Sequence, residues 1–181
     1  MATVMRATLA MLLFWTACAW AQSDLRSAEV RIKAAFLYRF GEFVQWPPAT
    51  FAGPDSPFVI GVLGADEVGA ELEQVVADRK IQGRSVTVRR LRRGESTAGL
   101  HVLFVGQAES ARLQDILSAT RGQAVLTVTE GDNGLAAGSM INFVAAEEKV
   151  RFDVALPAAE RGQLKISSRL LGVARKVVTS S

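Results

Sequence analysis

The sequence has few of the side chains that build disulfides, metal sites and histidine-based catalytic sites. Its 181 residues include one cysteine, at position 18, and one histidine, at position 101. A single cysteine excludes a disulfide framework, a CxxC redox motif and a cysteine-rich zinc site. A single histidine excludes a histidine-rich metal site and leaves little room for a catalytic triad. We therefore expect no metal, no cofactor and no catalytic residues.

The charge balance and the composition exclude two further classes of protein. The chain has 21 Lys and Arg against 18 Asp and Glu, for a net charge of +3. This excess is too small to indicate a nucleic-acid-binding protein. A hydrophobic fraction of 49% and a charged fraction of 22% are those of a folded chain rather than a disordered one. The length suits a single domain.

The first 21 residues have the pattern of an export signal. Arg6 supplies a positive charge, residues 7–20 carry none, and Ala19-Trp20-Ala21 forms an A-x-A cleavage pattern. Such a segment is a secretory signal peptide, and its apolar run is shorter than the roughly 20 residues that a membrane-spanning helix needs. We predict cleavage after Ala21, which leaves an exported domain of residues 22–181.

Cys18 allows a second interpretation, in which the chain is a lipoprotein and Cys18 carries the lipid. The stretch Trp15-Thr16-Ala17-Cys18 lacks the aliphatic residue that usually lies three positions before such a cysteine. We favour the cleaved signal peptide, whose removal leaves the mature chain without a thiol. An exported chain without disulfides must obtain its stability from its core.

Residues 27–44 have the spacing of a helix that is buried on two sides. The apolar stripe on its helical wheel consists of Ile32, Phe36, Phe40 and Phe43. Lys33 interrupts this apolar arc, and Glu29 precedes it by one turn in the favourable i,i+4 order. We favour a structural pair in which the lysine side chain snorkels to the surface. The alternative is a polar contact in a groove that binds a ligand or a partner.

Apolar runs and turn signals predict the strands of the domain. Largely apolar runs at 58–63, 102–105 and 124–128 are typical of buried strands. Val86 and Val88 alternate with Thr87 and Arg89, which predicts a strand that is half exposed. Residues 140–144 and 150–155 alternate in the same way around a charged turn, which predicts an antiparallel hairpin.

Amphipathic helices are expected between the strands and at the end of the chain. Asp66 is the expected N-cap of one helix, and a second is expected around Leu113, Ile116 and Leu117. A last helix is expected after Ser167 or Ser168, with four residues facing inward: Leu170, Val173, Ala174 and Val177. Strand–helix–strand units followed by a hairpin predict an α/β single domain with a mixed β-sheet and helices on both faces.

Three local patterns invite a functional interpretation, and we favour a structural one for each. Gly61-Val62-Leu63-Gly64 has the spacing of neither a GxGxxG motif nor a Walker A loop, so we expect a tight strand-to-helix turn. His101 begins an apolar strand with no nucleophile motif nearby. Asp132 lies in the turn Gly131-Asp132-Asn133-Gly134 without the alternating carboxylates of a calcium loop.

Basic residues are concentrated in one short stretch of the chain. They are Arg79, Lys80, Arg84, Arg89, Arg90, Arg92 and Arg93. We favour a solvated edge strand, where charges block unwanted pairing. The alternative is a docking patch for an acidic partner or an anionic surface.

Six motifs in order resemble those of the YfiR-like periplasmic family. The first two are the stretches at 33–40, KAAFLYRF, and 43–47, FVQWP. The others are the strand at 101–105, LTV at 126–128, the pair GSMINF at 138–143 with VRF at 150–152, and LKISSRLL at 164–171. The resemblance extends from about Val30 to Val177, nearly the whole of the predicted mature chain.

The resemblance implies a non-enzymatic periplasmic regulator. The namesake of the family represses a membrane diguanylate cyclase by binding its periplasmic sensory part, and an outer-membrane lipoprotein relieves the repression. Cyclic-di-GMP output and biofilm formation are the downstream effects. By resemblance, the partner here is a membrane signalling protein of the GGDEF type with a periplasmic domain, with an outer-membrane lipoprotein as a second candidate. A nucleic-acid partner is not expected, and a homodimer stays open.

The resemblance also singles out residues for partner binding. Combined with the polar residues that interrupt apolar faces, it favours two patches: Lys33, Phe36, Tyr38 and Arg39 on the first helix, and Arg151 with Lys165, Ser167, Ser168 and Arg169. Relatives carry cysteines where this chain has Leu100, before the His101 strand, and at the position of Asn142. A disulfide-based switch is therefore in doubt for this chain.

Two other functions compete with the regulator that acts by binding a partner. A periplasmic small-molecule sensor would require a deep apolar pocket beside the first helix. A filled core with an exposed apolar patch would favour the adaptor instead. An enzyme, such as a hydrolase, is the least favoured, because no nucleophile–base pair or metal set is visible.

Overall fold

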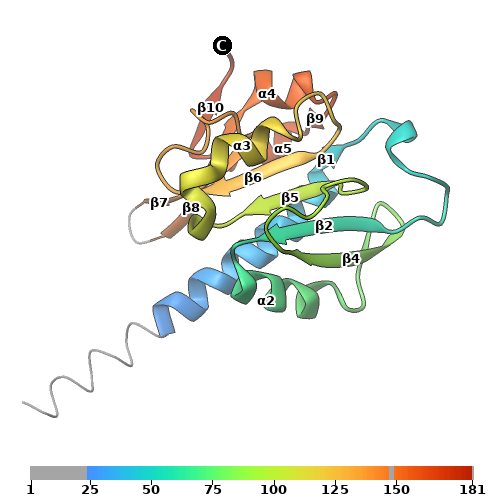
Figure 1. Ribbon diagram of the computed structural model, residues 1–181, viewed down its shortest axis with the longest axis horizontal. Coiled ribbons are helices and arrows are strands. Elements are labelled where there is room, and N and C mark those ends of the chain that lie inside the picture. The colour runs from blue at the N-terminus through green and yellow to red at the C-terminus, as the bar shows by residue number, and fades with distance from the viewer. Residues whose placement is uncertain (1–23, 147–148, 181) are drawn as a thin grey trace, which may run out of the picture.

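A computed structural model of the protein describes residues 24–146 and 149–180. The signal peptide expected at 1–21, with Cys18 in it, lies outside the described residues. Within the described parts, the chain forms one domain with a mixed sheet and helices on both faces (Figure 1). The α/β fold predicted from the sequence is therefore confirmed.

The main sheet of the described residues has eight strands in the order β10-β8-β7-β6-β5-β2-β4-β3. The neighbours from β4 to β7 run parallel, β8 and β3 are antiparallel to β7 and β4, and β10 is parallel to β8. The bounds are β2 Phe58–Leu63, β3 Lys80–Ile81, β4 Arg84–Leu91, β5 Val102–Val105, β6 Leu126–Glu130, β7 Ile141–Ala146, β8 Lys149–Ala155 and β10 Lys176–Val178.

Each face of the sheet has its own core cluster, because alternate residues of a strand point to opposite faces. Phe104 of β5 joins a large cluster that includes the first helix (24–43), α2 (Asp66–Val76), α4 (Leu156–Arg161) and α5 (Ser168–Leu171). Leu103 joins a smaller cluster with α3 (Leu113–Ser118), which follows the 3₁₀ helix η2 (Gln107–Arg112). In Figure 1 the blue first helix runs behind the sheet and α3 lies in front of it.

The buried stripe of the first helix differs from the predicted one. Ala34, Leu37 and Phe40 are fully buried, whereas Ile32 is 41% exposed. Gly41 brings the helix backbone close to Ile81, since a Cβ on Gly41 would lie 2.6 Å from Cδ1 of Ile81. The buried side of the helix therefore follows Ala34, Leu37 and Phe40, and Ile32 lies outside it. The prediction for Ile32 was therefore wrong, and its exposure leaves an apolar face unpartnered.

The chain ends in a strand where the sequence predicted the continuation of a helix. Ser167 is the N-cap of α5, as expected, but α5 ends at Leu171. The backbone N–H of Arg175 then donates to the carbonyl of Phe152, and β10 pairs with β8. Val173, expected to face inward, is 57% exposed. Pairing with the edge of β8 outweighs the helical spacing of these residues.

Two smaller features complete the fold. Ala65, not Asp66, is the N-cap of α2, and Asp66 is the first helical residue. A separate pairing in the described chain joins β1 (Val44–Gln45) to β9 (Lys165–Ile166), and a short 3₁₀ helix, η1 (Pro48–Thr50), follows β1. Among the residues described, none of the helices has both the length and the apolar character to span a bilayer.

Candidate functional site

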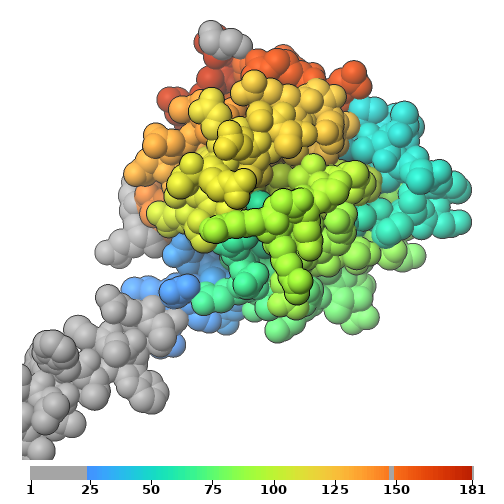
Figure 2. All heavy atoms as spheres, in the orientation of Figure 1, coloured from blue at the N-terminus to red at the C-terminus, as the bar shows by residue number. Residues whose placement is uncertain are grey.

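An open groove separates the start of the first helix from the β7–β8 hairpin. Its helix wall carries Leu25, Ala28, Ile32 and Phe36, and its hairpin wall carries Phe143, Val144, Ala145 and Val150. Charged side chains form its rim: Glu29, Lys33, Glu130, Asp132, Lys149, Arg151, Asp153, Arg175 and Lys176. Figure 2 shows the blue start of the helix at the edge of the molecule, and Leu25 and Ile32 on this wall are 72% and 41% exposed.

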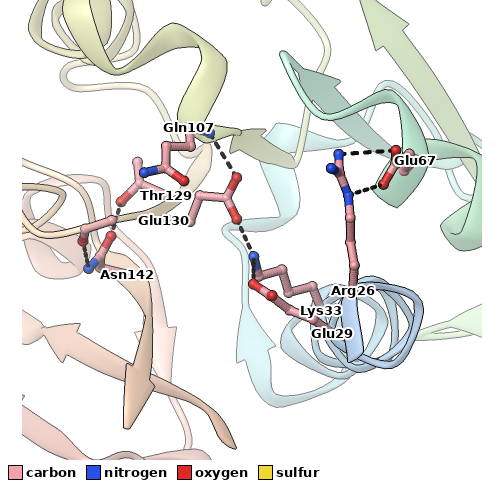
Figure 3. Close-up of polar contacts among 9 residues, drawn as sticks. Arg26, Glu29, Lys33, Glu67, Gln107, Thr129, Glu130 and Asn142 are labelled. Carbon is pink, nitrogen blue, oxygen red and sulfur yellow. Dashed lines mark hydrogen bonds and ion pairs between the residues drawn. The ribbon is translucent and has the colours of Figure 1, made fainter. Parts of the chain in front are cut away.

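Lys33, which lines the groove, connects the first helix to the end of β6. Its ammonium group forms ion pairs with Glu29 at 2.5 Å and with Glu130 (Figure 3). The other carboxylate oxygen of Glu130 accepts from the backbone N–H of Gln107 at 2.8 Å. Burial by itself lowers the pKa of Lys33, but the hydrogen bonds and negative charges of Glu130 and Glu29 outweigh it and raise that pKa. The expected Glu29–Lys33 pair is present, but the lysine side chain is 12% exposed and lines the groove instead of snorkelling to the surface. Glu130 is a partner that the sequence did not indicate.

A second ion pair fastens the first helix to α2. The guanidinium group of Arg26 donates to both carboxylate oxygens of Glu67, at 3.0 and 3.1 Å (Figure 3). With Lys33 and Glu130, this pair spans the carboxyl ends of β2, β5 and β6, where open α/β sheets usually take their ligands. The chain's own charges thus occupy the edge of the sheet next to the groove.

The glycine turn at the end of β2 packs tightly against the turn at the end of β5. A Cβ on Gly106 would lie 2.4 Å from the carbonyl oxygen of Gly64, so the turns after β2 and β5 are in contact. Gly64 has a φ of +69°, which a glycine adopts without strain. The expected tight turn is confirmed.

Asn142 lies in a hydrogen-bonded network where relatives can carry a cysteine. Its Nδ2 donates to the carbonyl of Gly131 at 2.7 Å, and its Oδ1 accepts from Oγ1 of Thr129 at 2.8 Å (Figure 3). The network holds the turn that contains Asp132, so the turn interpretation of that residue is supported. Leu100, at the other cysteine position, is buried in the smaller core cluster.

Three of the predicted partner-binding residues meet at the groove. Lys33 and Phe36 line its helix wall, and Arg151 lies on its rim. Phe36 also packs on Phe40, Phe143 and Phe152, so it contributes to both the core and the wall. Tyr38 lies elsewhere, donating to the carbonyl of Lys80 at 3.2 Å. Arg39 is exposed outside the groove lining.

The other four predicted residues gather at the opposite end of the first helix. Lys165 pairs with Gln45 in the small sheet, and the backbone N–H of Ser167 donates to the carbonyl of Phe43. Ser168 and Arg169 are exposed on α5. The structure thus divides the predicted set into a groove group, a group beside β1 and β9, and two residues, Tyr38 and Arg39, that belong to neither.

Most of the basic cluster is used inside the domain. Nη1 of Arg84 lies 2.7–2.9 Å from the carbonyl oxygens of Gly53, Pro54 and Ser56. Other members donate to carbonyls or carboxylates: Arg89 to Ser96 and Ala98, Arg90 to Glu73, and Arg93 to Glu109. These residues hold loops and helices to the sheet, which supports a structural interpretation over a docking patch.

Several groove residues were not predicted from the sequence. Leu25 and Ile32 are separated by seven positions, a spacing that marks one helix face, but their exposure depends on how the helix sits on the sheet. Asp153 and Arg175 form an ion pair at 2.8 and 2.5 Å on the rim, which requires the pairing of β10 with β8. In the described residues, no cluster of three or more histidine or acidic side chains is placed to hold a metal.

These features define an α/β domain with an open groove beside the carboxyl ends of its parallel strands. The family model for YfiR/HmsC-like proteins matches residues 30–175, most of the chain. The chain therefore belongs to the YfiR/HmsC-like family, which groups periplasmic, regulatory proteins linked to cyclic-di-GMP signalling. No curated protein matches the chain.

Proposed function

We propose that this chain is a periplasmic regulatory protein that represses or modulates a membrane diguanylate cyclase by binding its periplasmic sensory domain at the groove. Family membership supports the class of function. Cleavage after Ala21, which would release residues 22–181 into the periplasm, is part of the same proposal. The single structural observation that carries the docking site is the unpartnered apolar face of the first helix.

That face has the spacing of a helix–helix seam. Leu25, Ala28, Ile32 and Ala35 follow one another at intervals of three, four and three residues, the spacing at which one helix packs along another. They point away from the side of the helix that packs on the sheet. Leu25 is 72% exposed and Ile32 is 41% exposed. Large exposed apolar side chains in one stripe mark interaction sites, and the two alanines allow close approach.

The rim of the groove favours an acidic partner surface. Glu29 and Glu130 are paired with Lys33, and Asp153 is paired with Arg175. Among the described residues, Arg151 and Lys176 form no ion pair, and Asp132 is the acidic rim residue left to oppose them. The occupant is therefore an amphipathic helical segment of the sensory domain, with its apolar face on Ile32 and acidic residues toward Arg151.

Repression by docking follows from a difference in affinity. If the regulator binds the inactive conformation of the sensory domain more tightly than the active one, it shifts the cyclase toward the inactive state by that difference. A tenfold preference corresponds to about 1.4 kcal/mol. A few apolar contacts and one charge pair at the groove are enough to supply it.

The structure favours docking over a small-molecule sensor. Beside the first helix, Phe36, Phe40, Phe143 and Phe152 pack against one another with ring centroids 5.1–6.1 Å apart. This aromatic cluster fills the space where a deep ligand pocket would lie. The apolar area that remains lies on an open wall, which suits a partner protein.

The experiment measures cyclic-di-GMP in the native host. Deletion of the gene should raise cyclic-di-GMP, and the wild-type gene should restore it. Ile32→Glu should fail to restore it, whereas Val173→Glu, at an exposed apolar position outside the groove, should restore it fully. Both variants are checked for wild-type amounts in the periplasm. Unchanged cyclic-di-GMP on deletion would contradict the proposed function, and full activity of Ile32→Glu would contradict the groove.

A further inference from the structure

His101 lies inside a stack of aromatic rings at the end of the sheet opposite the groove. Its ring stacks against both Phe51 and Phe58, with ring centroids 4.5 and 4.8 Å away, and the residue is 4% exposed. Its carbonyl accepts from the indole N–H of Trp46 at 3.1 Å. Trp46 and Phe51 belong to the segment 46–57, which connects β1 to β2. His101 therefore contacts both the beginning and the middle of this segment.

One hydrogen bond fixes the protonation state of the imidazole. Nδ1 of His101 accepts from the backbone N–H of Val59 at 3.0 Å, so Nδ1 carries a lone pair and the proton of the neutral ring is on Nε2. Nε2 is buried without a hydrogen-bond partner in the described part of the chain. A second proton on Nδ1 would set one donor against another and place a charge in a buried site.

A permanent positive charge lies close to the same stack. Arg84 lies on β4, and its guanidinium carbon is 3.9 Å from the ring centroid of Phe51. Asp55 is the one titratable residue in segment 46–57 and is exposed, and β2 and β5 contain none. Burial first, and the charge of Arg84 second, lower the pKa of His101 from 6.5 to about 4. No carboxylate among these elements offsets the repulsion.

We infer that protonation of His101 in acid releases segment 46–57 from the sheet. The imidazolium breaks the bond to Val59 and repels Arg84, which also clamps the segment through the carbonyls of Gly53, Pro54 and Ser56. Because Trp46 directly follows β1, and β1 pairs with β9, release also loosens the surface that presents Lys165 and Arg169. This device is independent of the groove and of the proposed function.

The sign of the effect follows from the direction of the pKa shift. In the closed form, with segment 46–57 on the sheet, His101 binds its second proton less tightly than in an open form, with the segment released, where its pKa has the ordinary value of 6.5. The closed form is therefore most favoured above pH 6.5, and its advantage is lost as the pH falls toward 4. A lowering from 6.5 to about 4 corresponds to a rise of roughly 80-fold in the open-to-closed ratio between pH 6.5 and pH 4, and of roughly 300-fold between the limits of high and low pH.

The sequence provides a clean experiment, because residues 22–181 contain one tryptophan, Trp46, and one histidine, His101. The mature protein, prepared without a histidine tag, is titrated from pH 8 to pH 3. Trp46 emission and the His101 ring resonances should change together below pH 6, while the far-UV circular dichroism of the sheet is retained. A Trp46 change that occurs only with loss of the sheet signal, or no change at all, would overturn the inference.

Two variants assign the transition to the imidazole. His101→Gln keeps an acceptor for Val59 but does not titrate, so it should abolish the change in Trp46 emission. Asp55→Asn removes the one carboxylate of the segment and should leave the transition unchanged. If His101→Gln does not fold, the coincidence of the histidine and tryptophan titrations in the wild type decides the question. Their separation by more than one pH unit would overturn the inference.

Discussion

The ammonium group of Lys33 and the carboxylate of Glu130 form an ion pair that joins the first helix to the carboxyl end of β6. Both side chains are largely buried, with 12% and 15% of their surface exposed. The pair sets the position of the helix whose outer face forms one wall of the groove. Its loss should therefore affect both stability and docking.

Replacing Lys33 by Met tests the contribution of this pair. The variant keeps the apolar stem but leaves Glu130 without its cation, so we expect a loss of about 2 kcal/mol in the free energy of unfolding. Urea unfolding of residues 22–181 measures it. Arg26→Met is the matched control, because Arg26 is 73% exposed in its pair with Glu67 and should lose less than about 1 kcal/mol. Equal losses would show that burial does not distinguish the two pairs.

The same lysine predicts an alkaline effect. Because the pKa of Lys33 is raised above its ordinary value of 10.5, the folded state holds this proton more tightly than the unfolded state. Its contribution to stability is complete below pH 10.5 and is lost as the pH rises through the higher pKa of the folded state. The stabilities of the wild type and Lys33→Met should converge above pH 10.5. A difference that stays constant to pH 11.5 would contradict this origin.

The turn between β6 and β7 should not tolerate a side chain at Gly134. A Cβ there would lie 2.0 Å from Oδ1 of Asn142 and 2.2 Å from Oγ1 of Thr129, so Gly134→Ala should cost about 1–3 kcal/mol. Gly53→Ala, where the space around the Cβ is open, should stay within about 0.5 kcal/mol of the wild type. Thermal unfolding of the two variants gives the comparison. Similar melting temperatures would show that the network yields without cost.

Residues 22–181 contain no cysteine, so the mature protein should not respond to thiol reagents. The unfolding midpoint and the restoration of normal cyclic-di-GMP should be the same with and without dithiothreitol. Intact mass of the periplasmic protein should correspond to a chain that begins at Gln22. A lipid-modified mass that retains Cys18 would support the lipoprotein interpretation instead.

Strands bounded by strong local signals were predictable from the sequence. Phe58–Leu63 lies between Pro57 and Gly64, and Val102–Val105 ends at Gly106, so composition and turn chemistry agree. The end of the chain was not predictable, because Lys176–Val178 becomes a strand through pairing with β8 rather than through its own spacing. The helical spacing continues to Val177, but the helix ends at Leu171 and the pairing with β8 determines the structure that follows.

The groove was only partly predictable for a similar reason. Lys33 was singled out because it interrupts an apolar arc, but its partner Glu130 is 97 residues away and carries no local signal. Phe36 and Arg151 came from the family resemblance, and they meet only because the hairpin extends beyond the end of β6. Ile32 was assigned to the core, since periodicity marks an apolar face without showing what covers it.

Site-specific photo-crosslinking in the native host tests the central claim most directly. A photoreactive residue is placed at position 32 in the groove or at position 173 outside it, and crosslinked proteins are identified by mass spectrometry. The account predicts that position 32 crosslinks to the periplasmic domain of a GGDEF membrane protein and that position 173 does not. A GGDEF protein captured only from position 173, or from neither position, would contradict it.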